Sequence, residues 1–250
     1  MKTDWDYTTL AEAYVRRPDY SGEVVRALVS IAGVNAGDVV CDVGAGVAHL
    51  TLMLAQAGLV VDAVEPNDAM RNIGSTRTRV HEDVRWFDGV GEATGRPSNH
   101  YGLVTFGSSF NVCDRAKALV ESKRMLRDRG WFACLWNHRN LEDPIQNSIE
   151  NIIKSRVPGY GYGSRREDQT AVIEGSGLFE PVVHVSGSVI HRQSVAACVE
   201  AWRSHATLER QAGESFPLVI GDIHDFLHGL GVAEISIPYT TNSWIAQLRA

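Results

Sequence analysis

The sequence has no apolar run long enough for a transmembrane helix, and its first residues, MKTDWDYTTLAEAY, lack the apolar core of a signal peptide. Cysteine is scarce as well: the 4 cysteines lie far apart and match neither a zinc spacing nor a disulfide framework. The histidines show no ligand spacing tied to carboxylates, so we expect no metal site. These absences predict a cytoplasmic protein that does not bind membranes.

An excess of positive charge is also absent. Lys and Arg together number 24 against 30 Asp and Glu, which gives a net charge of -6. This balance disfavours a broad electrostatic grip on nucleic acid, so we expect a small-molecule substrate. We further expect a monomer or a homodimer. With 44% hydrophobic and 22% charged residues, the 250-residue chain has the composition of a globular domain.

Short apolar runs alternate with amphipathic stretches from residue 22 to residue 137. The runs predict strands at 38–43, 59–65, 84–89, 101–109 and 131–137. The amphipathic stretches predict helices at 22–33, 49–58, 67–77 and 117–130. This alternation predicts an α/β fold in which a parallel sheet is covered by helices on both faces.

The alternation ends after residue 137. The remaining segments predict a helix at 142–157, a glycine- and tyrosine-rich loop at 158–167, a strand or hairpin at 179–194, helices at 194–208 and 216–231, and a closing strand at 235–248. No repeat or low-complexity linker divides the chain. We therefore expect a single domain, 1–250, with a substrate-facing insertion at 138–178.

The stretch VVCDVGAGVAHL places Gly44 and Gly46 between the first strand and a helix, where a ligand can approach the backbone. A dinucleotide site favours a third glycine at position 49, which is His49, and a hydrophobic residue in place of Asp42. A carboxylate there suits a cationic cofactor such as S-adenosylmethionine, which has an ammonium group, a sulfonium and no phosphate. Glu65, at the end of the second strand, can bind a ribose diol, which both cofactor classes contain. A helix-capping Asp42 and a surface Glu65 are the structural alternative.

Several motifs together resemble the class I S-adenosylmethionine-dependent methyltransferases, in the small-molecule branch related to the ubiquinone/menaquinone and trans-aconitate enzymes. They are AEAYVRRPDYSGEVV, VCDVGAGVAHLT, VDAVEPNDAM, WFDGVGEATGRP, TFGSSFNVCD, RMLRDRGWFACLWNHR and IPYTTNSWIAQ. The resemblance covers nearly the whole chain. It implies a Rossmann-like, seven-stranded, mostly parallel sheet of order 3-2-1-4-5-7-6 with the last strand antiparallel.

The resemblance also implies roles for residues. The methionine end of the cofactor falls to Asp42, Gly44 and Gly46, and the ribose falls to Glu65 with its neighbour Pro66. Met70 packs on the adenine, the backbone amides of Gly91 and Glu92 meet the adenine edge, and Ser108 and Ser109 lie beside the sulfonium. The N-terminal lid helices, within 1–30, place Tyr20 on the cofactor and Tyr14 and Arg17 toward the substrate.

The resemblance has departures as well. Family members often have Phe-His-Trp where this chain has Phe110, Asn111 and Val112, so a histidine base at that position is missing. Asn111 can orient a nucleophile or contact the substrate, but it cannot take a proton at neutral pH. Ala48 replaces a frequent third glycine.

A sulfonium methyl is already activated for displacement, so alignment of the acceptor and exclusion of water can suffice. For a hydroxyl or amine acceptor, which is the expected class, a base assists. His138 is the first candidate, since it follows the fifth strand at the ligand-binding end of the sheet; the alternative is an exposed loop histidine.

Arg139 and Tyr160 belong to an arginine- and tyrosine-rich insertion that suits a planar anion, although exposed arginines are common. Trp202 lines the cavity or, as we expect, fills the core. Two further functions stay open: a protein that binds S-adenosylmethionine without methylating, and an NAD(P)-dependent oxidoreductase.

Overall fold

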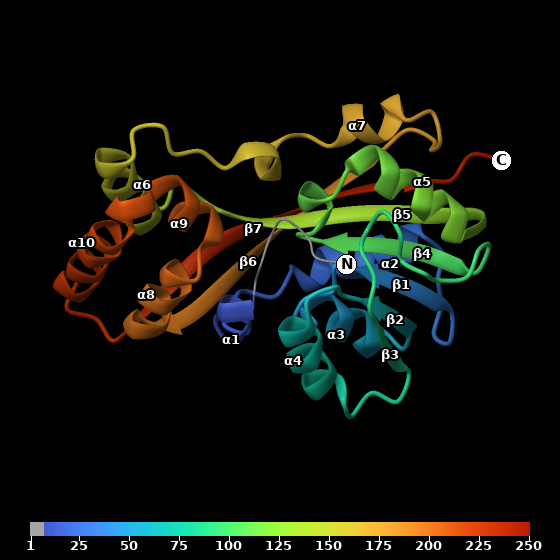
Figure 1. The fold of residues 1–250 in the computed structure, drawn as a ribbon, viewed down its shortest axis with the longest axis horizontal. Helices are drawn as coiled ribbons and strands as arrows, with labels where there is room; N and C mark the ends of the chain where they lie inside the picture. Colours follow the sequence, from blue (N-terminus) through green and yellow to red (C-terminus); the bar gives the residue numbers. More distant parts are fainter. Residues whose placement is uncertain (1–7) are drawn as a thin grey trace.

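The computed structural model describes residues 8–250, so the first part of the expected 1–30 lid, residues 1–7, lies outside the described residues. A seven-stranded sheet of order β3-β2-β1-β4-β5-β7-β6 forms the centre of the molecule (Figure 1). Its strands are β1 Val39–Val43, β2 Val60–Val64, β3 Val84–Phe87, β4 Tyr101–Gly107, β5 Leu126–Arg139, β6 Val183–Ser194 and β7 Glu234–Gln247. Only β7 runs antiparallel to its neighbours, which confirms the expected topology.

Helices surround the sheet and precede or follow nearly every strand. They are η1 Thr8–Leu10, α1 Ala11–Tyr14, α2 Gly22–Ile31, α3 His49–Gln56, α4 Asp68–Thr78, η2 Phe110–Val112, α5 Arg115–Met125, α6 Pro144–Arg156, η3 Gly163–Arg166, α7 Thr170–Gly175, α8 Val195–Arg203, α9 Ala206–Ala212, η4 Gly213–Ser215 and α10 Phe216–Gly229. In the described part of the chain, no helix combines the length and the apolar character needed to cross a bilayer.

Several helices begin at a side chain that caps their free backbone amides. Asn67 accepts the Met70 N–H at the start of α4, and Asp143 accepts two amides at the start of α6, with Pro144 as the first helical residue. The Ser194 side chain accepts the Ala197 N–H at the start of α8. These caps place the boundaries of α4 and α8 next to strand ends, where ligands bind in such sheets.

Buried apolar side chains lie on both faces of the sheet, since alternate strand residues point to opposite sides. On one face Val104 and Phe132 pack against Leu119 of α5 and Ile173 of α7. On the other face Leu103, Leu135 and Ile245 pack against Leu28 of α2 and Leu54 of α3. The central strands are therefore covered on both sides, as a parallel sheet requires.

A third apolar cluster lies beyond the carboxyl end of β4, where the long strands β5, β6 and β7 extend past the rest of the sheet (Figure 1). It joins α6, α8, α9 and α10, which we call the helical lobe. Trp202 is buried in this cluster, as expected. The expected insertion at 138–178 supplies α6, and the segment between β6 and β7 supplies the other three helices.

Two local expectations were wrong, and one that had left two alternatives was decided. The helix expected at 117–130 ends at Met125, because the backbone turns to an extended conformation at Leu126 and β5 begins there. The segment 179–194, expected as a strand or a hairpin, contains the single strand β6, which confirms the first alternative. The helix expected at 194–208 is interrupted after Arg203, and His205 caps a separate helix, α9.

Candidate functional site

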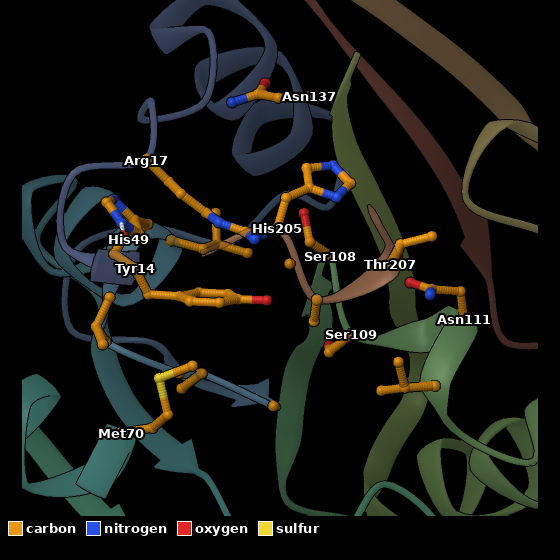
Figure 2. A pocket seen from close by; sticks show the side chains of 18 of the residues that line it. Tyr14, Arg17, His49, Met70, Ser108, Ser109, Asn111, Asn137, His205 and Thr207 are labelled. Carbon is orange, nitrogen blue, oxygen red and sulfur yellow. Dashed lines mark hydrogen bonds between the residues drawn. The ribbon is translucent and has the colours of Figure 1, made fainter. Parts of the chain in front are cut away.

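A cavity of about 550 Å³ lies at the carboxyl ends of β1, β2, β4 and β5 and reaches the helical lobe. Sites for small molecules commonly have about 300–1,000 Å³. The cavity is lined by every site residue predicted from the sequence except Tyr160. Figure 2 shows Tyr14 and Arg17 entering it from one side, and Asn111 and Thr207 from the opposite side.

Asp42 is the penultimate residue of β1 and is 1% exposed. Its two carboxylate oxygens accept hydrogen bonds from Thr51 Oγ1 at 2.7 Å and Thr105 Oγ1 at 3.0 Å. Burial raises the pKa of Asp42 from its ordinary 3.8 to about 6, and the two hydroxyls only partly offset this effect. The group thus stands ready to bind a cation, which would relieve the cost of its burial.

The glycine turn after β1 needs both of its glycines, for different reasons. Gly44 has φ +68°, and a Cβ there would collide with the side chain of Ser109. Ser109 in turn donates to the carbonyl of Val43 at 2.6 Å. Gly46 has φ +57° and open space where a Cβ would point. The turn therefore holds β1 and β4 together at Gly44 and leaves room for a ligand at Gly46.

Glu65 follows β2 and is 7% exposed. Its Oε2 accepts the Gly46 N–H and its Oε1 accepts the Asn67 N–H, each at 2.9 Å. Burial raises the pKa of Glu65, while the two amides oppose that shift. Each oxygen keeps a second acceptor position, so the carboxylate can bind a pair of hydroxyls.

The cavity wall beyond Glu65 is built from the start of α4 and the segment after β3. Pro66 and Met70 line it, and Met70 packs with Ala11 of α1. A Cβ at Gly91 would lie 2.5 Å from Cys113 Sγ, so a larger residue there would displace the Cys113 side chain. Glu92 accepts the Asp114 N–H at 2.5 Å, which ties this segment to the start of α5.

The N-terminal segment is attached to the cavity at two points. Tyr20 is buried, and its hydroxyl lies 2.9 Å from Ser108 Oγ, at the end of β4. His49, the first residue of α3, has Nδ1 2.7 Å from Asp19 Oδ1 and Nε2 2.9 Å from the carbonyl of Tyr14. Both partners of the ring are acceptors, so both contacts are hydrogen bonds only when the imidazole is doubly protonated.

The candidate proton acceptor, His138, lies within β5 rather than after it, because that strand extends to Arg139. Its Nδ1 is 3.3 Å from the amide of Asn242 on β7. Asn111 in η2 accepts the indole N–H of Trp136 at 3.0 Å, which fixes the amide plane at the cavity wall. Both residues line the cavity.

The prediction that Tyr160 lines the site was wrong. Tyr160 is 6% exposed and packs in the apolar cluster of the helical lobe. Gln211 binds both backbone groups of Gly161, which holds the loop so that Tyr162 faces the cavity instead. The sequence pattern of alternating tyrosines and glycines could not distinguish the two rings.

Sequence reasoning missed a group of lining residues that the tertiary structure brings from β5, β6, α9 and β7. They are Asn137, His191, Gln193, His205, Thr207, Arg210 and Tyr239. His205 is 4% exposed, stacks on Trp202 and accepts the Leu208 N–H at its Nδ1, so the neutral ring carries its proton on Nε2. The Ser-His-Ala-Thr break between the two helices was the available signal, since a polar residue at that point predicts a cap. Among residues 8–250 no cluster of ligating side chains forms a metal site.

Comparisons with known sequences match part of the chain. The family model described as a methyltransferase domain matches residues 41–134. An uncharacterised methyltransferase of Mycobacterium tuberculosis is 32% identical over 129 residues, which are 51% of this chain and 50% of that protein. A ubiquinone/menaquinone biosynthesis C-methyltransferase of Rubrivivax gelatinosus is 29% identical over 113 residues, or 44% of this chain and 43% of that protein. The chain spans about half the length of the curated relatives it matches.

Solved structures resemble nearly the whole chain. One from Anaeromyxobacter dehalogenans, provisionally described as a type II methyltransferase, has a TM-score of 0.64 at 17% identity and covers 92% of this chain and 97% of that one. Phosphoethanolamine N-methyltransferase 2 of Haemonchus contortus, bound to phosphomonomethylethanolamine and S-adenosylhomocysteine, has a TM-score of 0.55 at 14% identity, with coverages of 97% and 58%. At these identities the likeness establishes the fold. These structures confirm the fold that the resemblance implies, and the family model supports a methyltransferase domain over residues 41–134.

Proposed function

We propose that this chain, which carries the methyltransferase domain on the class I fold, transfers a methyl group from S-adenosylmethionine to a small-molecule acceptor, leaving S-adenosylhomocysteine. The observation that carries the proposal is the pair of buried carboxylates, Asp42 and Glu65, on either side of a glycine turn with open space at Gly46. A cofactor with an ammonium group and a ribose, but no phosphate, matches this pair.

The same turn fits a dinucleotide poorly. The Gly46 N–H, which would face a pyrophosphate, donates instead to Glu65, so a phosphate there would meet a carboxylate. At the position of the third glycine, His49 holds the N-terminal segment through Asp19 and Tyr14. These contacts disfavour the NAD(P)-dependent oxidoreductase.

When bound, the cofactor supplies a methyl group on a positively charged sulfur, already activated for displacement. In our proposal Asp42 binds the ammonium group and Glu65 binds the ribose hydroxyls. Met70 packs on the adenine, whose edge meets the amides of Gly91 and Glu92. Ser108 and Ser109, together with Tyr20, lie beside the methionine end.

The other half of the cavity, toward the helical lobe, receives the acceptor. Asn111 orients it through an amide fixed by Trp136, and His138 takes the proton that an oxygen or nitrogen nucleophile releases. The N-terminal segment, with Tyr14 and Arg17, covers the cavity and excludes water. Activity then depends mainly on alignment of the acceptor with the methyl group.

Calorimetric titration tests cofactor choice directly. We expect S-adenosylmethionine and S-adenosylhomocysteine to bind, and NADH not to bind. Replacing Asp42 by Ala should weaken cofactor affinity by about 10- to 100-fold, the usual effect of losing one charge-assisted hydrogen bond. Asp83→Ala removes the same charge from the exposed surface and serves as the matched control. Binding of NADH, or an unchanged affinity in Asp42→Ala, would contradict the assignment.

Transfer itself requires a second measurement. The protein is incubated with methyl-labelled S-adenosylmethionine and fractions of a small-molecule metabolite extract, and the label is followed into the fractions. Label in an acceptor that depends on active protein supports a methyltransferase. Cofactor binding without transfer to any fraction would favour the protein that binds S-adenosylmethionine and does not methylate.

A further inference from the structure

The charged side chains that line the cavity are separated by sign. Among the described lining residues the carboxylates are Asp42, Glu65 and Glu92, all in the half assigned to the cofactor. The arginines come from elsewhere in the chain and are Arg16, Arg17, Arg139, Arg166 and Arg210. The wall toward the helical lobe is thus rich in guanidinium groups and has no carboxylate among the described lining residues.

Arg139, the last residue of β5, is enclosed by aromatic rings rather than by acids. Its guanidinium carbon lies 4.0 Å from the ring centre of Trp202 and 5.6 Å from that of Tyr239. Its Nε is inaccessible to solvent and has no hydrogen-bond partner among the described residues. Trp202 is itself held by stacking on His205 at 5.3 Å, so this platform is fixed before any ligand arrives.

Several other arginines of the described residues have an acidic partner, which Arg139 lacks. Arg85 pairs with Asp62 at 2.7 Å, and Arg124 pairs with Glu121 at 2.7 Å. A second cation lies close to Arg139: Arg166 donates to the Arg139 carbonyl at 3.0 Å, and the Arg166 guanidinium lies over Tyr162. A partly buried cation without a counter-charge is costly unless a ligand supplies the missing charge.

We infer that the methyl acceptor is an anion, a small molecule with a carboxylate or phosphate that the Arg139 guanidinium binds at the wall of the cavity near the helical lobe. The inference rests on the proposed function and specifies its substrate class. The planar fork of arginine binds two oxygens of such a group at once. Trp202 and Tyr239 hold that fork in place, so little of its freedom is lost on binding. Arg17 is not part of the inference, because it lies over Tyr14 on the N-terminal segment.

The test measures binding to protein saturated with S-adenosylhomocysteine. The probes are benzoate and phenyl phosphate, with benzamide as the uncharged counterpart, in calorimetric titrations at low ionic strength. We expect both anions to bind at least about 10-fold more tightly than benzamide, because only they can form charge-assisted hydrogen bonds. Added salt should reduce this preference. Equal binding of benzamide, or no anion binding up to about 50 mM, overturns the inference, and neither result depends on a variant.

Variants then assign the preference to one residue. Arg139→Gln should weaken anion binding by about 10- to 100-fold, and Arg139→Lys, which keeps the charge but loses the fork, should fall between it and the wild type. Arg156→Gln is the matched control, since Arg156 of α6 pairs with Asp222 and does not line this cavity. An anion preference that survives Arg139→Gln refutes the role of Arg139. Titration of S-adenosylhomocysteine into each protein separates the outcomes: retained cofactor binding without anion binding refutes only this inference, whereas absent cofactor binding refutes the proposed function.

Discussion

Asp42 destabilises the fold that contains it, and replacing it by Asn should make the ligand-free protein more stable. Asp62, a buried aspartate on the neighbouring strand β2, gives a matched contrast. Both aspartates are buried, but Asp62 accepts hydrogen bonds from the charged Arg85 at 2.7 Å and from Tyr101 at 2.6 Å, whereas the donors to Asp42 are all neutral: the hydroxyls of Thr51 and Thr105 and the backbone of Thr51. The same substitution should therefore have opposite effects at the two positions.

The magnitude follows from the pKa of Asp42, which burial raises from 3.8 to about 6. At 1.36 kcal/mol per pH unit, keeping this group ionised costs about 3 kcal/mol at neutral pH. A weakened hydrogen bond to one threonine in Asp42→Asn offsets about 1 kcal/mol of that gain. We expect a net stabilisation of about 2 kcal/mol, or about 4 to 8 °C in Tm for a chain of this length.

The sign of the pH dependence is a second check. Because the folded protein holds the Asp42 proton more tightly than the unfolded chain does, the cost is absent below about pH 4 and complete above about pH 6. The stabilisation of Asp42→Asn relative to the wild type should therefore be largest at pH 7 and decrease as the pH falls, until below about pH 4 only the loss of about 1 kcal/mol from the weakened hydrogen bond remains.

Thermal denaturation of the ligand-free proteins across this pH range, followed by circular dichroism, measures both effects. We expect Asp62→Asn to lower the free energy of unfolding by about 1 to 3 kcal/mol, because it leaves Arg85 without its partner. Asp42→Asn should at the same time lose cofactor affinity. At pH 7, a fall in Tm for Asp42→Asn comparable to that of Asp62→Asn would refute the reasoning.

Three other predictions concern the same region. Glu65→Gln should weaken S-adenosylmethionine binding by about 10-fold or more in calorimetry, since a neutral amide replaces the carboxylate proposed to bind the ribose. Hydrogen exchange of residues 11–20 should be faster in His49→Ala than in the wild type, because the substitution removes the contacts of the imidazole with Asp19 and with the carbonyl of Tyr14. Gly44→Ala should lower Tm by several degrees more than Gly46→Ala, because both have positive φ but only the first new methyl meets a side chain.

The cofactor half of the site could be predicted from sequence because its signals are short and contiguous. Asp42, Gly44 and Gly46 lie within five residues, and Glu65 ends the next strand. In a parallel sheet the carboxyl ends of neighbouring strands meet at one edge, so local order along the chain already implies proximity in space. The strand order and the antiparallel last strand followed from the resemblance.

The half of the cavity proposed to bind the acceptor could not be predicted, because it is formed by contacts between segments that are distant in the sequence. Arg139, Trp202 and Tyr239 come from β5, α8 and β7, and no local pattern indicates that they meet or that Arg139 finds no acid there. The sequence also could not show that Tyr162, and not Tyr160, lines the cavity. That choice depends on Gln211, which binds both backbone groups of Gly161 between the two tyrosines.

The sequence by itself determined which chemistry lies at the tips of β1 and β2, because the backbone turn and its two carboxylates are properties of a few consecutive residues. Only the tertiary structure decided which residues face these carboxylates. The opposite wall of the cavity forms where β5, β6 and β7 extend past the other strands and the helical lobe packs against these three strands. Packing over long sequence separations selects those contacts, and it leaves no periodic signal in the chain.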